Sequence, residues 1–206
     1  MREMTELEVG EWLICLSSWV IQDGNYEDFE LGQRRQFALE FMADELHAAE
    51  PCTKSVLGLG EGAYEVIAEV RLSDAVGDER LNVLDFGLLA YSDARLEKRA
   101  AGSWIAGRLV LSVDCYSYYE IHAKRDDVPA AVYTWAITGI WRQTAPFIPG
   151  GTEYMKLMVR DPERLGYMPL EKTDAWSDDE GHGEYVLRCR LEPDAPTRHP
   201  RPAGTR

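Results

Sequence analysis

Residues able to bind a ligand or to titrate occupy every second position between residues 114 and 122. They are Asp114, Tyr116, Tyr118, Glu120 and His122. Side chains two residues apart on a β-strand point to the same face, so this spacing predicts one functional face. The two tyrosines offer flat walls to a ligand, and the carboxylate–imidazole end could transfer a proton. We therefore take these five residues as the first candidates for a ligand-binding site.

The alternation begins upstream, at Trp104, and its opposite parity is apolar, which is typical of a half-buried strand. A single strand from Trp104 to His122 would span roughly 60 Å, longer than ordinary strands. We therefore expect a bulge, bend or corner near residues 112–115, which would put the two halves of the pattern on different surfaces. A solvated sheet face decorated with cross-strand pairs explains the same pattern without a ligand.

A second aromatic row lies on the predicted strand 132–142, where Tyr133, Trp135 and Trp141 share one parity. Trp135 and Trp141 could stack on a ligand, and core packing accounts equally well for their spacing. If this strand pairs with residues 116–122, the tyrosines and tryptophans would face one cavity. The sequence alone does not establish that pairing.

Signatures of catalysis are few. The chain contains no phosphate-binding G-x-x-x-x-G-K-[ST] loop, no G-x-S-x-G nucleophile elbow and no H-E-x-x-H zinc motif. An enzyme would have to use Glu120 and His122, with Asp114 or Asp85 assisting. The acidic residues of segment 174–184 do not match EF-hand spacing, so we expect a solvated loop there, and we expect no metal or cofactor.

Two short segments are similar to one another. Gly60-Glu61-Gly62-Ala63-Tyr64 and Gly181-His182-Gly183-Glu184-Tyr185 each lead into an alternating strand. Glycine before an aromatic strand start is common turn chemistry, so we interpret the pair as two similar turns. Internal duplication is the alternative interpretation.

The predicted elements are mainly strands. Strand-like patterns occupy residues 11–22, 33–42, 64–72, 81–91, 104–122, 132–142, 152–159 and 184–192. Helix is expected only as one or two turns in 43–51 and a turn at Asp161-Pro162, and the charged segment 93–101 could be a short helix or a loop. This favours a mainly β, antiparallel sandwich or barrel with little helix. We expect one β-rich domain over residues 8–192, and a disordered tail over 193–206, where prolines and arginines are concentrated.

The net charge limits the partners. The 206-residue chain carries a formal charge of −14, and its last twelve residues hold three Arg and no acid, so residues 1–194 carry −17. Such a body is repelled by nucleic acid and by anionic lipid. No apolar run approaches the ~20 residues that span a bilayer, and the four cysteines form no C-x-x-C pair. We expect a cytoplasmic protein with reduced thiols and no membrane or nucleic-acid partner.

These observations lead first to a non-catalytic binding or adaptor protein that engages a protein partner. The first alternative is a small-ligand-binding barrel with a pocket lined by Tyr116, Tyr118, Trp135 and Trp141. The second is an enzyme that uses the Glu120–His122 pair. Because an all-β chain must close, cover or pair its edge strands, a homodimer is a further expectation.

Overall fold

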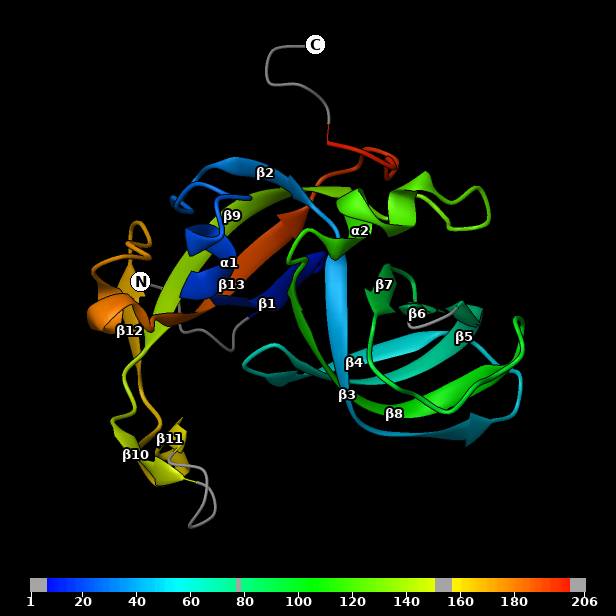
Figure 1. Cartoon of the computed structure of the whole chain (residues 1–206), viewed down its shortest axis with the longest axis horizontal. Coiled ribbons are helices and arrows are strands. Elements are labelled where there is room, and N and C mark those ends of the chain that lie inside the picture. The colour runs from blue at the N-terminus through cyan, green and yellow to red at the C-terminus, as the bar shows by residue number, and fades with distance from the viewer. Residues whose placement is uncertain (1–6, 77–78, 151–156, 201–206) are drawn as a thin grey trace.

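The computed structural model describes residues 7–76, 79–150 and 157–200. Strands account for 51% of it and helix for 10%, which confirms a mainly β chain with little helix. The strands form a closed five-stranded barrel and a curved sheet beside it (Figure 1). Of the two architectures left open by the sequence, the barrel is the one present.

Five strands close the barrel. They are β3 (Leu39–Ala49), β5 (Ala63–Val76), β6 (Glu79–Asp85), β7 (Leu89–Ser92) and β8 (Trp104–Val113). Antiparallel pairing joins β5, β6 and β7 in order, and β8 pairs with both β5 and β3. A short parallel contact of Leu39 with Ala90 and Glu40 with Tyr91 completes the ring. The hairpin strand β4 (Ser55–Gly60) pairs with β5.

Apolar side chains fill the barrel. On β5 the alternation predicted over residues 64–72 is confirmed as far as Val70, because Tyr64, Val66, Ala68 and Val70 are buried, whereas Leu72, which follows a bulge, is half-buried. They pack with alternate residues of β3 and β8, including Phe41, Leu39, Ile105, Leu109 and Leu111. The barrel interior is therefore a hydrophobic core.

One correction concerns residues 43–49, which extend β3 instead of forming helical turns. The extension pairs with β8 and contains a bulge between Ala43 and Glu45. Opposite the bulge, Gly107 has a φ of +149°, and a Cβ there would lie 1.8 Å from the Glu45 carbonyl oxygen. Pairing with β8 thus overrides the local helix propensity.

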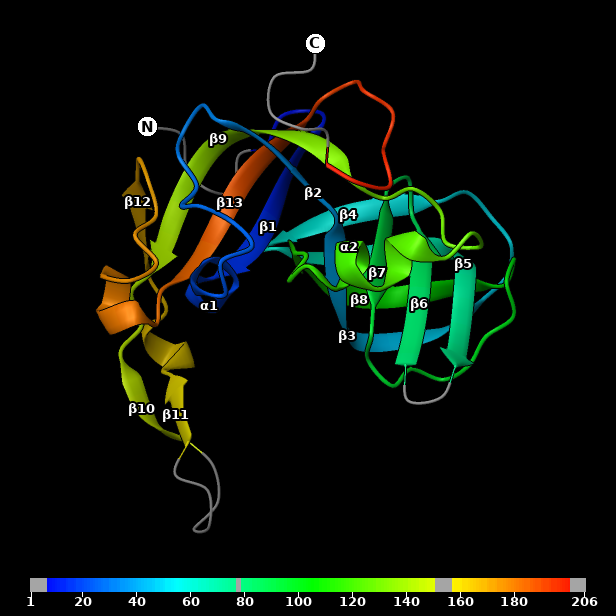
Figure 2. The same cartoon turned by 45° about the horizontal axis from the view of Figure 1, so that its top comes forward.

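The curved sheet lies beside the barrel (Figure 2). It consists of β12 (Tyr167–Leu170), β9 (Tyr133–Gln143), β13 (Glu184–Leu191) and β1 (Glu11–Ser17) in that order, with β2 (Arg34–Phe37) also paired to β9. Cys15 of β1 bridges to Ser112 of β8, which makes one continuous sheet. The Tyr64 hydroxyl accepts from the Leu13 amide at 2.7 Å and donates to the Leu13 carbonyl at 3.1 Å, a second tie between the layers.

Short elements complete the fold. They are α1 (Ser18–Gln22), α2 (Ser117–Glu120), the 3-10 turns η1 (His122–Lys124), η2 (Pro162–Arg164) and η3 (Asp178–Gly181), and the projecting ribbon of β10 (Phe147–Gly150) with β11 (Leu157–Arg160). The predicted strand 11–22 thus ends at Ser17. The segment 152–156 of another predicted strand lies outside the described residues.

The segment expected to begin the tail makes several contacts. Thr197 exchanges backbone hydrogen bonds with Val132 at 2.8 and 2.9 Å. The Arg198 guanidinium donates to the carbonyls of Ala123, Arg125 and Asp126. Residues 201–206 lie outside the described part. In the described residues, no helix has the length and apolar character needed to cross a membrane.

Candidate functional site

The strand that begins at Trp104 ends at Val113, so residues 114–122 do not form the predicted strand face. Tyr116 takes a left-handed conformation with a φ of +85°, and the chain then enters α2. The expected bend near residues 112–115 is confirmed. The prediction that an extended strand continues beyond this bend to His122 was wrong, because a helical turn follows it.

The helical turn gathers three of the five predicted residues. Asp114, Tyr118 and His122, four residues apart, are buried on the outer wall of the barrel beside Tyr91. The Tyr91 hydroxyl and the Tyr118 amide both donate to Asp114 Oδ1. His122 Nε2 lies 2.6 Å from Asp93 Oδ1. The rings of Tyr91 and His122 lie 5.5 Å apart, so this ring contact joins the two hydrogen-bonded groups into one buried network.

The other two residues of the pattern separate from this network. Tyr116 packs edge-on against Tyr119 with ring centroids 4.6 Å apart, and Glu120 is exposed. Asp85, a secondary candidate, forms an ion pair at 2.6 Å with Lys54. The Glu120–His122 pair therefore lacks the shared strand face on which the enzyme hypothesis relied.

The network holds carboxyl groups in an environment that disfavours their charge. Burial raises the pKa of Glu40 to about 7, and the neighbouring Asp114 and Asp93 add to the effect. Burial also raises the pKa of Asp114 to about 6, although the Tyr91 hydrogen bond opposes this. Within the described part of the chain, neither Glu40 nor Asp114 forms an ion pair with Lys or Arg. Since Asp114, Tyr118 and His122 are at most 2% exposed, the network is closed to a ligand.

The two predicted tryptophans occupy different surroundings. Trp135 is fully buried, stacks on Phe37 at 5.5 Å and donates from Nε1 to the Phe37 carbonyl. Trp141 lies on the curved sheet, where the Arg188 guanidinium is 5.0 Å from its ring centroid. It lines a groove of about 460 Å³. Its strand β9 pairs with β2, β12 and β13. Tyr116, Tyr118, Trp135 and Trp141 therefore do not converge on one cavity.

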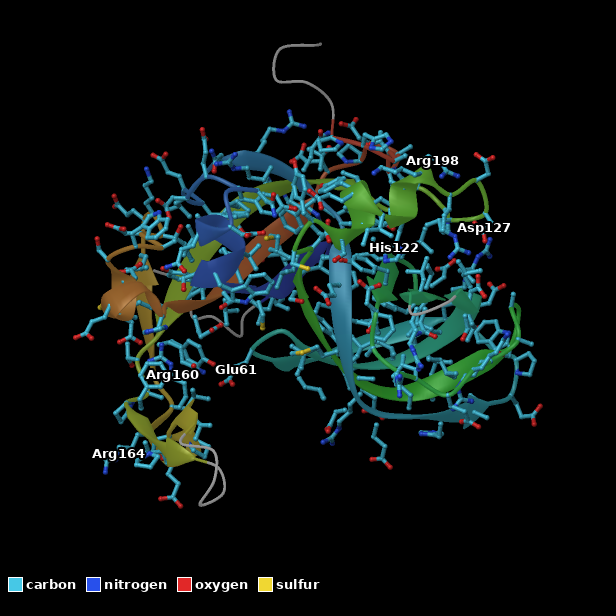
Figure 3. The ribbon with its side chains drawn as sticks, viewed as in Figure 1. Glu61, His122, Asp127, Arg160, Arg164 and Arg198 are labelled. Atoms are coloured by element: carbon cyan, nitrogen blue, oxygen red, sulfur yellow. The ribbon has the colours of Figure 1, made fainter. Side chains whose placement is uncertain are left out.

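A cleft of about 750 Å³ lies between the barrel and the curved sheet. Seven segments line it: β1 with α1, the β4–β5 turn, the end of β9, the β10–β11 ribbon, β12, the end of η3 and the start of β13. Its polar lining includes Cys15, Ser17, Glu61, Arg160, Tyr167 and Glu184. Figure 3 shows Arg160 near the ribbon and Glu61 on the barrel side of this opening. We refer to this cavity as the interlayer cleft.

A glycine-rich turn brings Glu61 to the interlayer cleft. Glu61 has a φ of +53° between Gly60 and Gly62, whose φ values are +97° and +79°. A Cβ on Gly62 would lie 2.6 Å from Cys15 Sγ, so only glycine lets the turn approach β1 so closely. The Cys15 thiol donates to the Glu61 carbonyl at 3.3 Å.

Three ionisable side chains of the interlayer cleft have raised pKa values. Burial, together with Glu184 and Glu61, raises the pKa of the Cys15 thiol to about 12. Burial also raises the pKa of Glu184, although a 2.8 Å hydrogen bond from Ser17 and the nearby Arg160 oppose this. Burial and the nearby Glu61 raise the pKa of Tyr167. The cleft thus presents a protonated thiol and two carboxyl groups to a ligand.

Arg160 is engaged in the wall of the interlayer cleft. Its guanidinium forms an ion pair with Asp179 and donates to the carbonyls of Ala145 and His182 at 2.9 and 2.8 Å. It also lies 4.1 Å from the centroid of the Phe147 ring. These contacts fasten the ribbon to the main body.

Sequence reasoning did not assign the interlayer cleft, although one signal was available. The two similar segments, Gly60–Tyr64 and Gly181–Tyr185, both contribute to its lining, the first through Glu61 and the second through Glu184 among others. In the acidic loop, Asp178 and Asp179 pair with Arg142 and Arg160. No group of three or more His, Cys, Asp or Glu is placed to hold a metal ion within residues 7–76, 79–150 and 157–200.

Comparison with known proteins returned no match. No protein-family model matches the chain, and neither a search of curated proteins nor a search of solved structures gives a significant similarity.

Proposed function

We propose that this protein is a non-catalytic binding protein that holds a small ligand in the interlayer cleft. The observation that carries the proposal is the cavity itself. Its volume of about 750 Å³ lies within the range of roughly 300–1,000 Å³ typical of ligand sites. A few polar groups from separate strands converge on it among aromatic and aliphatic side chains, which is the usual composition of such sites.

The state of the polar groups supports binding over catalysis. A thiol with a pKa near 12 has almost no thiolate at neutral pH, so Cys15 is a poor nucleophile. The Arg160 guanidinium is held in the wall of the interlayer cleft by its contacts with Asp179, Ala145 and His182. The proposal keeps the small-ligand hypothesis and moves its site away from the Tyr116 and Trp135 region.

The test is a fragment screen by saturation-transfer NMR on the wild type and on two variants. Val159→Trp places a large ring in the interlayer cleft, and Ile121→Trp adds the same ring at a position of similar exposure outside it. We expect fragments that bind the wild type to lose at least tenfold in affinity for Val159→Trp and to keep their affinity for Ile121→Trp. The proposal would be refuted if the wild type bound no fragment, or if the fragments bound Val159→Trp with the same affinity as the wild type.

A second candidate function is association with a second copy of this chain through β4. Within the described strands β4 pairs only with β5, so its other edge is open. Its sequence, SVLGLG, is uncharged, and Leu57 is 61% exposed. On a chain with a charge of −14, an uncharged edge is where two copies repel each other least.

Sedimentation velocity tests this association. Leu57→Lys should convert a dimer to a monomer, because it places two charges across the paired edges. Met42→Lys is the control, since Met42 is equally exposed on β3. A wild type that is monomeric at all concentrations rules the association out.

A further inference from the structure

We infer that the ligand of the interlayer cleft is a small organic cation, an amine or guanidine on an apolar body, seated between Glu61 and Glu184. This inference rests on the proposed function and names the chemical class of its ligand.

The first argument is the placement of the two carboxylates. Cys15 and Ser17 lie two residues apart on β1, so they share one face and are about 6.5–7 Å apart. The Cys15 thiol bonds to the backbone of Glu61, and the Ser17 hydroxyl bonds to the side chain of Glu184. Glu61 and Glu184 both line the cleft, and each is hydrogen-bonded to one of these two neighbouring positions of β1, Glu61 through its backbone carbonyl and Glu184 through its carboxylate.

The second argument is the lack of an ion pair for these carboxylates within the described residues, although Arg160 lies close enough to Glu184 to oppose the rise in its pKa. Neither Glu61 nor Glu184 lies within 4 Å of a Lys or Arg nitrogen in the part of the chain that the structure describes. Arg160, the basic residue of the lining, is already paired with Asp179 and two carbonyls. Two like charges that share a low-dielectric cleft favour a positive guest. Burial is the main cause of the raised pKa of the Cys15 thiol, and Glu184 and Glu61 raise it further.

The third argument is the aromatic lining. Trp19 lines the cleft with 53% of its surface exposed, and Tyr167 lies beside Glu61. Exposed aromatic faces next to carboxylates bind the apolar body of an organic cation and add cation–π attraction. An inorganic ion would leave these faces without a partner. A cavity of this size also holds a ring and a short chain, not only a single ion.

The test uses three probes that share one skeleton and differ in charge at pH 8. Tyramine is a cation, 4-hydroxyphenethyl alcohol is neutral and 4-hydroxyphenylacetate is an anion. We expect tyramine to bind at least tenfold more tightly than the neutral probe, and the anion to bind least, as measured by NMR titration.

Variants of the two carboxylates complete the test. Glu61→Gln and Glu184→Gln should each weaken tyramine binding about fivefold to tenfold and leave the neutral probe unchanged. Glu50→Gln removes the same charge from an exposed position outside the cleft and should have no effect. Thermal melting of each variant verifies its fold.

The outcomes separate the two proposals. Neutral or anionic probes that bind as tightly as tyramine overturn the cation inference and leave the binding cleft in place. Tyramine binding that survives both carboxylate variants also overturns it. Failure of all three probes, together with an empty fragment screen, overturns the proposed function itself.

Discussion

The carboxyl of Glu40 should make the protein less stable as the pH rises. Its pKa is raised by burial from 4.5 to about 7, with further contributions from Asp114 and Asp93. A raised pKa in the folded state means that folding favours the protonated carboxyl. The stabilisation is present below pH 4.5 and is lost as the pH rises through 7. Glu40→Gln imitates the protonated form at every pH and should remove this dependence.

The magnitude follows from the difference between the two pKa values. A difference of about 2.5 pH units at about 1.4 kcal/mol each gives roughly 3.5 kcal/mol. Glu40 is partly exposed, and solvent screening reduces this to about 1–2 kcal/mol. We therefore expect Glu40→Gln to be more stable than the wild type by about 1–2 kcal/mol at pH 8, and equally stable near pH 4.5.

Urea unfolding followed by tryptophan fluorescence at pH 5, 6, 7 and 8 measures the difference. Glu50→Gln is the control, because this substitution removes the same formal charge at an exposed position. A Glu40→Gln variant that is less stable than the wild type at pH 8 would refute the reasoning. So would a difference in unfolding free energy that stays constant from pH 5 to 8.

Three further predictions concern the network and the interlayer cleft. Tyr91→Phe should lower the free energy of unfolding by about 1–2 kcal/mol in urea titrations, since Asp114 loses a buried hydrogen bond. Gly62→Ala should lower the melting temperature more than Gly24→Ala, because both have a φ near +80° but only the former meets Cys15. Cys15 should react with iodoacetamide at pH 8 at least tenfold more slowly in the folded protein than in urea, as peptide mass spectrometry would measure.

Local side-chain patterns were sufficient to predict the mainly β fold class. The alternation of Tyr64, Val66, Ala68 and Val70 places one face of β5 in the core, and the structure buries all four. The length of the 104–122 pattern predicted the bend at its middle. Both inferences succeed because period 2 and strand length are properties of the local backbone.

The same local patterns were insufficient at residue 116. Asp114, Tyr118 and His122 satisfy a spacing of two and a spacing of four equally well. The left-handed turn at Tyr116 selected the helical alternative and buried these three residues against Tyr91. Residues 43–49 show the same effect, since pairing with β8 made a strand of a segment with helical propensity.

The sequence by itself determined a mainly β chain, an apolar core and a formal net charge of −14. Only the tertiary structure decided that Cys15, Glu61, Arg160 and Glu184 share one cleft. The four residues lie far apart in the chain, and their meeting depends on how β1 joins the barrel and how the β10–β11 ribbon folds back. Such placement results from long-range packing, which no local period encodes.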